Sequence, residues 1–346
     1  MEVNNPAISV VIPCLNERNR ILPLLDALAI QDARNFEVIL ADGGSDDGTR
    51  DLLHDYAEKH PDFPLRVIDN PQKSTAAGLN RAIRDACADI IIRLDGHSRP
   101  ANDYVQRCCD VLRKSGADVV GGVWRIGPGR PGTIAEAIAV GVGSILGAGA
   151  SLYRVGAERP AQDADTVPFG CFRKTTWAEL GGYNESLLSN EDYEFNFRVR
   201  RRGGRVHFDP TISCEYFARP TLRALARQYW RYGWWKAQML KIYPTSLKLR
   251  QAIPPVWILA SVCLPVLGRV WTGPAMLAAA LWLCYLTTVC YFSARLAKTH
   301  GQRFFLPLVA VFPTIHFAWG LAFWFGLVGI PVCMTNPKHR KLCPGT

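Results

Sequence analysis

Two short acidic stretches, almost a hundred positions apart, could carry chemistry. The first is RLDGH at residues 93–97, directly after an apolar run. In extended backbone, residues i and i+2 project to the same face, so Asp95 and His97 could point together at one cation. A carboxylate suits Mg²⁺ or Mn²⁺, and an imidazole shifts the balance towards Mn²⁺. A loop carboxylate beside a solvated histidine explains the same residues equally well.

The second stretch is NEDYE at residues 190–194, which opens a helical pattern ending in RRRG at 200–203. Carboxylates in a first helical turn and basic residues in the last turn are ordinary, because both oppose the helix dipole. Glu191 and Asp192 could also act as bases. Sugar transfer with inversion needs a carboxylate that accepts the proton of an acceptor hydroxyl as the anomeric carbon is attacked.

Polar residues also follow two earlier strand-like runs. Asn16 and Glu17 could hold a ribose or a base edge, or they could simply begin a helix. Asp42 precedes two glycines, which permit a tight turn close to a ligand, and it could accept hydrogen bonds from a base or ribose. Asp46 or Asp47 could instead cap the next helix. The glycines of this turn do not fit the pattern GxGxxG, so the turn is not a dinucleotide fingerprint.

A long helix rich in arginine and aromatic residues is expected over 221–243. Arg223, Arg227 and Arg231 recur every four residues and therefore share a face. Such a stripe can bind pyrophosphate or lipid phosphate. The tyrosines and tryptophans between them suit a membrane interface. A generic amphipathic interfacial helix is the alternative reading.

The elements that must position these residues alternate along the first 126 residues. This alternation predicts a mostly parallel sheet with helices on both faces, where ligands bind outside the carboxyl ends of the strands. The strand-like runs are 7–13, 36–40, 65–68, 89–94 and 118–123, and the helical stretches between them are 20–30, 47–60 and 75–87. Residues 133–152 are apolar but rich in glycine, which favours a buried or interface-lying helix over a membrane span.

Charge divides the chain of 346 residues. Forty Lys and Arg against thirty Asp and Glu give +10, yet residues 251–346 hold seven basic and no acidic side chains. Three uncharged segments lie there, at 251–268, 270–294 and 304–337. A bilayer core needs about 20 helical residues, so the second is a good span and the first is borderline.

The third uncharged segment is too long for one straight span, and Pro313 could break it. It is either one tilted span or a re-entrant pair, and the basic residues after it favour the pair. Arg295, Lys298 and Arg303 place the loop 295–303 on the cytoplasmic side, after an even number of crossings.

Composition excludes several classes. An apolar content of 49% excludes a disordered chain. Eleven cysteines without a CxxC pair argue against a disulfide scaffold or a zinc site, and favour free thiols. The surplus positive charge lies beside apolar segments, so nucleic acid is not an expected partner. The opening residues lack a basic region, so we expect no signal peptide and a cytoplasmic N-terminal domain.

Four motifs in order resemble glycosyltransferase family 2, which has the GT-A nucleotide-sugar fold. They are VVIPCLNE, ADGGSDDGT, RLDGH and GGYNESLLSNEDYEFNFRVRRRGG, and they span roughly residues 7–235. The RLDGH variant, the stretch VPFGCFRK and the apolar tail resemble succinoglycan-type exopolysaccharide glucosyltransferases. The resemblance implies inverting transfer of glucose from a UDP-sugar donor to a polyprenyl-pyrophosphate-linked saccharide, with membrane lipid as a partner and Mg²⁺ or Mn²⁺ as cofactor.

The resemblance also implies a role for each matching residue. Asp95 corresponds to the first acid of the family's DxD and would lie near the diphosphate and the metal, with His97 in place of the second acid. Asp192 would be the base, with Glu191 beside it. The nucleotide pocket would be lined by Pro13, Asn16, Glu17, Asp42 and Asp46. Gln228, Arg231 and Tyr232 are similar to the QxxRW motif, with Tyr in place of Trp, and would bind the acceptor diphosphate.

These patterns together predict a chain of four parts. Residues 1–220 would be the GT-A catalytic domain and 221–250 an amphipathic interfacial helix. Residues 251–337 would form transmembrane or re-entrant helices, and 338–346 a basic tail. The protein would be a multi-pass inner-membrane protein with its catalytic domain in the cytoplasm. A non-catalytic membrane scaffold that binds nucleotide-sugar, and a processive polysaccharide synthase, are the alternative functions.

Overall fold

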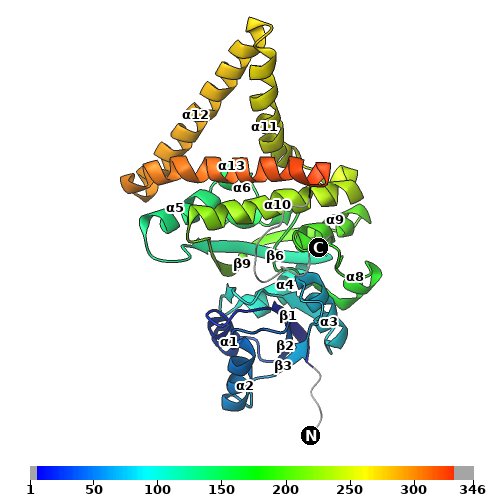
Figure 1. Ribbon diagram of the computed structural model, residues 1–346. Coiled ribbons are helices and arrows are strands. Elements are labelled where there is room, and N and C mark those ends of the chain that lie inside the picture. Colours follow the sequence, from blue (N-terminus) through cyan, green and yellow to red (C-terminus); the bar gives the residue numbers. More distant parts are fainter. Residues whose placement is uncertain (1–5, 331–346) are drawn as a thin grey trace. The chain divides into compact units, whose positions relative to one another are not determined.

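The computed structural model of the chain describes residues 6–330, which form two compact units. The first unit comprises the chain up to Arg125 together with Ser151–Tyr216. The second comprises Ile126–Ala150 and the chain from Phe217 onward. Figure 1 labels many of the helices and strands of these units.

A parallel sheet forms the centre of the first unit. Its strands β1 (Ile8–Cys14), β2 (Phe36–Asp42), β3 (Leu65–Asp69) and β4 (Ile90–Arg93) lie in the order β3-β2-β1-β4. Cys14 is level with Asp42, and Asp42 with Asp69, so these strands end at one edge of the sheet. The predicted parallel sheet is confirmed, and the residues that follow its strands gather at that edge.

Antiparallel strands extend the sheet beyond β4, which the alternating pattern did not predict. β8 (Cys171–Arg173) pairs antiparallel with both β4 and β6 (Val119–Gly127). β9 (Val206–Phe217) follows β6 in the strand order, and it pairs antiparallel with β5 (Arg99–Pro100) and β7 (Gln162–Asp163). The five strand-like runs of the sequence correspond to β1, β2, β3, β4 and β6.

Helices cover both faces of this sheet, as predicted. On one face lie α1 (Ile21–Ala29), α2 (Thr49–Lys59) and α4 (Tyr104–Ser115); on the other lie α3 (Thr75–Asp85) and α9 (Glu191–Arg201). Val10 and Ile12 of β1 face the first core, while Val11 between them faces the second, because side chains alternate along a strand. The short helices α7 (Leu152–Val155) and α8 (Lys174–Glu179) complete the first unit.

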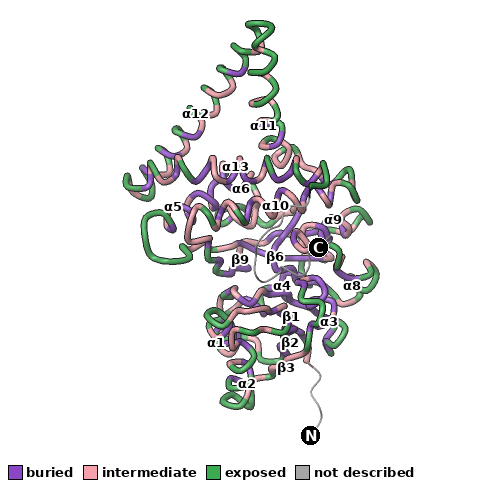
Figure 2. The backbone as a smooth tube through the Cα atoms, viewed as in Figure 1, coloured by how far each residue is buried: buried purple, intermediate pink, exposed green. Residues whose placement is uncertain are grey.

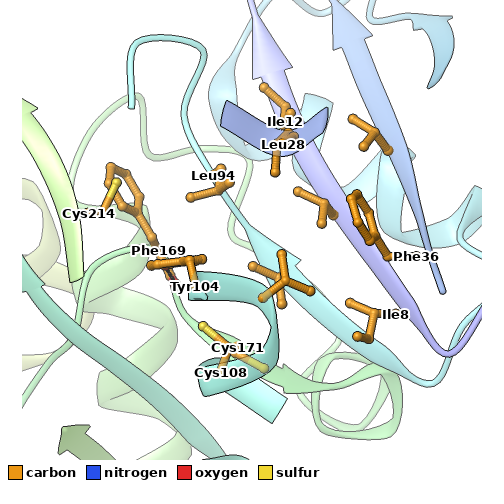
Figure 3. Close-up of a cluster of buried hydrophobic side chains, with 14 of the residues drawn as sticks. Ile8, Ile12, Leu28, Phe36, Leu94, Tyr104, Cys108, Phe169, Cys171 and Cys214 are labelled. Carbon is orange, nitrogen blue, oxygen red and sulfur yellow. Dashed lines mark hydrogen bonds between the residues drawn. The ribbon is translucent and has the colours of Figure 1, made fainter. Parts of the chain in front are cut away.

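Figure 3 shows the first of these cores, in which Ile12, Leu28 and Phe36 belong to the same cluster as Tyr104 and buried cysteines. Complete burial of a leucine or isoleucine side chain contributes about 2 kcal/mol, so α1 is held mainly by its apolar face. Cys108, Cys171 and Cys214 are free thiols in this core, as expected of a chain without a disulfide framework.

The second unit is helical. It contains α5 (Thr133–Val142), α6 (Ile145–Ala148), α10 (Leu222–Ile242), α11 (Leu249–Leu267), α12 (Thr272–His300) and α13 (Phe305–Val328), with single turns at Pro244–Ser246 and Gln302–Phe304. Residues 133–152, expected as one buried or interface-lying helix, are broken at Gly143. Ser144 caps α6 by accepting a hydrogen bond from the Gly147 amide. Ile138 and Val142 are buried, as expected.

Three helices of this unit are long and apolar enough to cross a membrane: α11, α12 and the segment Gln302–Val328, which contains α13. They differ in burial. Only 11% of the apolar window is buried in α11 and in α12, against 39% in the third. Figure 2 shows α11 and α12 as mostly exposed or intermediate along their length. A helix that exposes apolar side chains on every face is suited to lipid.

α13 corrects one expectation. The helix runs through Pro313 without a break as far as Val328, so the alternative in which that proline breaks the segment is wrong. It lies side by side with α10, where Val311 and Ile315 join a buried cluster with Leu225 and Tyr229 (Figure 1). That packing offsets the one backbone hydrogen bond that a proline removes. The end of the third segment, 331–337, and the basic tail, 338–346, lie outside the described residues.

Candidate active site

A buried arginine at the end of β4 brings three carboxylates together. Arg93 is 2% exposed. Its Nη2 donates to Asp95 Oδ1 at 2.9 Å and to Glu191 Oε1 at 2.8 Å, and its Nη1 donates to Asp192 Oδ1. Asp95 and Asp192, which the sequence singled out separately, therefore meet at one guanidinium. Arg93 itself was not singled out.

The start of α9 places Glu191 and Asp192 at this point. Asn190 adopts a left-handed conformation (φ 65°) just before the helix, so the chain turns sharply into its first two acidic residues. Further along α9, the Phe195 ring packs on Tyr183 at 4.6 Å and on Phe172 of β8 at 5.1 Å. These buried ring contacts fix the helix against the sheet that carries Arg93.

The loop before α9 is fixed by one buried amide. Asn80 of α3 donates to the Tyr183 carbonyl oxygen at 2.9 Å and accepts from the Tyr183 amide at 2.7 Å. It also donates to the Glu185 carboxylate at 2.8 Å and accepts from Trp177 Nε1 at 3.0 Å. All the hydrogen-bonding capacity of this amide is used, so the loop is held at both ends of Tyr183.

Electrostatics at the cluster favour a proton on one acid. The pKa of Asp192 is raised to about 7: burial is the largest cause, Glu191 and Asp95 add to the rise, and the Arg93 guanidinium opposes it. The physical cause is simple: three carboxylates share one guanidinium, so full ionisation leaves net negative charge in a site largely removed from water. A carboxyl group that ionises near neutral pH is suited to accept a proton from a sugar hydroxyl.

The expected geometry of Asp95 and His97 is wrong. The chain turns at residues 95–98 instead of staying extended, because the Ser98 amide and hydroxyl both donate to the Asp95 carbonyl oxygen. His97 Nδ1 lies 3.6 Å from Glu17 Oε1, while the Asp95 carboxylate faces Arg93. Their roles as metal ligands stay a prediction.

No group of three or more His, Cys, Asp or Glu side chains suited to a metal ion occurs within residues 6–330. This is compatible with Mg²⁺ or Mn²⁺ at Asp95, since such ions are often held by one or two carboxylates, with substrate phosphates and water completing the ligands. The one-quarter exposed Asp95 side chain supplies the kind of oxygen ligand that such a site needs.

The loops after β1 and β2 are joined directly. Asn16 Nδ2 donates to Asp46 Oδ1 at 2.8 Å, and the Asp46 amide donates to Asn16 Oδ1 at 2.9 Å. Asn16 does not cap α1, which begins at Ile21. Glu17 donates its amide to the Thr49 hydroxyl at 3.0 Å. Two loops expected in one nucleotide pocket thus lie together.

Asp42 has a different environment from the one expected of a ligand-binding acid. It is 1% exposed, and it accepts hydrogen bonds from the Ser45 hydroxyl at 2.6 Å and from the Gly44 amide at 3.2 Å. Its carboxylate therefore shapes the glycine turn. Pro13 lies in β1, level with Ala41 of β2, beneath the same loops.

Two cations beside these loops were not singled out from the sequence. Arg50 donates to Asp69 at 2.8 Å and lies 3.9 Å from Asp42. Lys73 has a positive φ of 59°, and its Nζ lies 3.7 Å from the position where a side chain on Gly44 would begin. Gly44, with φ 74°, has a backbone conformation that residues with a side chain rarely adopt, so the turn favours glycine there.

The three residues expected at the acceptor diphosphate belong to the second unit. Gln228 Nε2 donates to the Tyr232 hydroxyl at 2.9 Å, one helical turn away on α10. The Arg231 guanidinium carbon lies 5.8 Å from the centre of the Tyr232 ring. Arg231 Nε is buried, and no hydrogen-bond partner for it occurs in the described part of the chain. These residues are neighbours on one helix, as their spacing predicted.

Comparison with known proteins places the chain in a family. The model of "Glycosyl transferase family 2" matches residues 9–172. The chain is 32% identical over 333 residues to the succinoglycan biosynthesis protein ExoA of Rhizobium meliloti (strain 1021), covering 93% of this chain and 96% of that protein. The chain belongs to glycosyltransferase family 2. It is therefore an enzyme that transfers sugar, and the resemblance read from its motifs is confirmed.

Two further similarities support the fold and the family. A dolichyl N-acetyl-alpha-D-glucosaminyl phosphate 3-beta-D-2,3-diacetamido-2,3-dideoxy-beta-D-glucuronosyltransferase of Methanococcus voltae is 24% identical over 68% of this chain and 74% of its own length. The solved structure of the mannosyltransferase PcManGT from Pyrobaculum calidifontis, in complex with GDP-Man and Mn²⁺, superposes with a TM-score of 0.61 at 21% identity, over 88% of this chain and 86% of that one. The family 2 enzyme has the GT-A fold.

Proposed function

We propose that this glycosyltransferase moves glucose from UDP-glucose to a polyprenyl-pyrophosphate-linked saccharide, with inversion at the anomeric carbon, in the synthesis of an exopolysaccharide. The observation that carries the proposal is the convergence of Asp95 and Asp192 on Arg93. The similarity over nearly the whole chain to a succinoglycan biosynthesis protein supports the polysaccharide, and the names of relatives that act on lipid-linked sugars support the acceptor.

In this proposal Asp192 is the base. Its carboxylate accepts the proton of the acceptor hydroxyl while the hydroxyl oxygen forms a bond to the anomeric carbon. The bond from that carbon to the diphosphate breaks on the opposite side, and the nucleoside diphosphate departs with the electron pair. An α-linked sugar donor therefore gives a β-linked product.

The donor would lie over the loops that follow β1, β2 and β4. Asn16, Glu17 and Asp46 would border the nucleoside, with Pro13 and Asp42 shaping the pocket from below. Asp95, with His97 near it, would hold Mg²⁺ or Mn²⁺, which when bound neutralises charge on the leaving diphosphate. The Mn²⁺ in the PcManGT complex is compatible with this cofactor.

The acceptor's pyrophosphate would be bound by α10. Arg231 supports this role, because its Nε is buried without a hydrogen-bond partner among the described side chains, and a phosphate oxygen is a good acceptor for a guanidinium. Gln228 and Tyr232 would orient it. The saccharide's lipid tail would remain in the membrane beside the apolar helices.

We further propose that only α11 and α12 cross the membrane, as a hairpin. α10 carries Arg223, Arg227 and Lys241 and cannot enter the hydrocarbon core. α13 runs alongside it, from the cluster with Leu225 to the hydrogen bond from Lys241 Nζ to the Gly326 carbonyl oxygen at 2.8 Å. A helix held along such a partner lies at the membrane surface, whatever its hydropathy.

This topology keeps the catalytic domain on one side of the membrane. Two crossings return the chain to the side on which it started, which would place the basic loop 295–303 and the catalytic domain together. Basic loops concentrate in the cytoplasm, so this side would be the cytoplasmic face of the inner membrane. The α11 helix, at about 28 Å for 19 residues, matches the thickness of the hydrocarbon core.

The proposed function is tested by replacing the base. Asp192→Asn keeps the size of the side chain and its contact with Arg93 but cannot accept a proton at neutral pH. Membranes that contain the variant should bind UDP-glucose normally and transfer less than about 1% of the label that wild type transfers to extracted lipid acceptor. Normal transfer by this variant would show that Asp192 is not the base. Label in long polymer instead of in the lipid fraction would favour a processive synthase.

A further inference from the structure

One guanidinium contacts both sides of the proposed reaction. Arg93 uses Nε (3.3 Å) and Nη2 (2.9 Å) to bind Asp95 Oδ1, on the donor side. It uses Nη1 to bind Asp192, the proposed base, and Nη2 to bind Glu191 beside it. The two acids come from elements almost a hundred residues apart, and Arg93 contacts both of them.

We propose that Arg93 is the positioning residue of this enzyme, which sets the separation and orientation of the donor-side acid Asp95 and the base Asp192. This inference rests on the proposed function, because it takes Asp192 as the base. A guanidinium is planar and rigid, and its donors point in fixed directions. Two carboxylates bound to different edges of it are therefore held at a fixed distance and orientation to each other. The ammonium group of a lysine cannot fix them in this way.

The guanidinium can act as a reference point because it is itself held in place. The Arg93 amide donates to the Gly170 carbonyl oxygen at 3.1 Å, which ties the end of β4 to the chain just before β8. The side chain is 2% exposed. Tyr183 lies against it: burial and the charge of Asp192 raise the pKa of the Tyr183 hydroxyl, and the adjacent Arg93 opposes the rise. Asn80 in turn fixes Tyr183 at its amide and carbonyl groups.

The number of acids argues for more than a structural ion pair. A buried arginine needs one carboxylate to neutralise it, yet this one has three. Arg66, in contrast, binds the buried Glu37 at 3.0 Å and no other acid among the described ion pairs. An excess of negative charge around a buried cation makes the free energy of folding less favourable. Clusters of this kind are therefore found mainly at functional sites.

The test is Arg93→Lys, with Arg66→Lys as the matched control. Lysine keeps the positive charge but lacks the guanidinium's several N–H donors in fixed directions. Arg93→Lys should therefore lower kcat by about 10- to 100-fold, since a small misplacement of reacting groups lowers the rate by that factor. The affinity for UDP-glucose by calorimetry should fall less than kcat does, because lysine keeps a positive charge beside Asp95 and donor binding does not require the base. Arg66→Lys should leave kcat unchanged.

A double variant separates positioning from general damage. If Arg93 acts through Asp192, adding Arg93→Lys to Asp192→Asn should cost much less than Arg93→Lys costs alone, measured on the residual transfer. Equal losses in both backgrounds would overturn the proposal, and so would a normal kcat in Arg93→Lys. Normal transfer by Asp192→Asn alone would instead refute the proposed function.

A second variant covers the case in which Arg93→Lys does not fold, judged by its thermal melting. Tyr183→Phe keeps the ring that packs on Phe195 and removes only the hydroxyl beside Arg93. It should lower kcat by about three- to tenfold with donor affinity and melting temperature unchanged, as expected for a group that acts through orientation. A wild-type kcat in a folded Tyr183→Phe would then overturn the proposal.

Discussion

The pH dependence of sugar transfer follows from the charge around Asp192. With a pKa of about 7, Asp192 is protonated below neutrality and cannot accept the acceptor's proton. Transfer activity should therefore rise as the pH rises through this pKa. About a tenth of the enzyme carries ionised Asp192 at pH 6 and about nine tenths at pH 8, so kcat/KM should fall about tenfold between pH 8 and pH 6.

The assay is initial transfer of labelled glucose at subsaturating UDP-glucose, because kcat/KM reports the free enzyme. Glu191→Gln removes one of the two negative charges that raise the pKa of Asp192, so its profile should move to lower pH. Glu58→Gln makes the same chemical change at an exposed position in α2 and should leave the profile unmoved. A flat profile between pH 5.5 and 8, or a wild-type midpoint near pH 4, would refute the assignment of Asp192 as a base perturbed by burial.

Two further predictions concern the metal and the membrane. Asp95→Ala should abolish the part of UDP-glucose affinity that depends on Mn²⁺, measured by calorimetry with and without the ion; an unchanged affinity would contradict a metal role for Asp95. In a variant otherwise free of cysteine, Thr299→Cys and Val328→Cys should react with an impermeant thiol reagent from the same side of sealed vesicles, and Val270→Cys only from the other. Labelling of Val328→Cys from the same side as Val270→Cys would show that α13 crosses the membrane.

The parallel half of the fold could be predicted because each of its elements carries a local pattern. The strands β1, β2 and β4 are short runs of buried apolar residues, and α1 and α3 have one apolar face each. The antiparallel half could not be predicted in the same way. β8 has three residues and β5 has two, which is too short for any period to emerge.

The candidate site was predictable as a set of acids but not as an arrangement. Asp95, Glu191 and Asp192 stand out because carboxylates after a strand or at a helix start can do chemistry. Arg93 gives no such signal, since an arginine at the end of an apolar strand resembles an ordinary solvated terminus. Its role depends on where α9 lies, and that is fixed by ring contacts such as Phe195 with Phe172, which are distant in sequence. The turn at 95–98 was missed because spacing alone cannot distinguish a turn from extended backbone.

In the proposed topology, hydropathy alone would misassign α13 as a membrane span, for a related reason. An apolar composition shows that a helix could enter the hydrocarbon core. Whether it does so depends on the helices that pack against it. Gly233 and Gly326 let α10 and α13 approach closely, since a side chain on Gly233 would begin 2.3 Å from the Trp319 carbonyl oxygen and one on Gly326 2.8 Å from the Trp234 carbonyl oxygen. Backbones this close hold an apolar helix against a basic one along much of its length. In this proposal the charge on α10 decides the depth of both helices, because moving an arginine into hydrocarbon costs more than leaving one face of α13 at the interface.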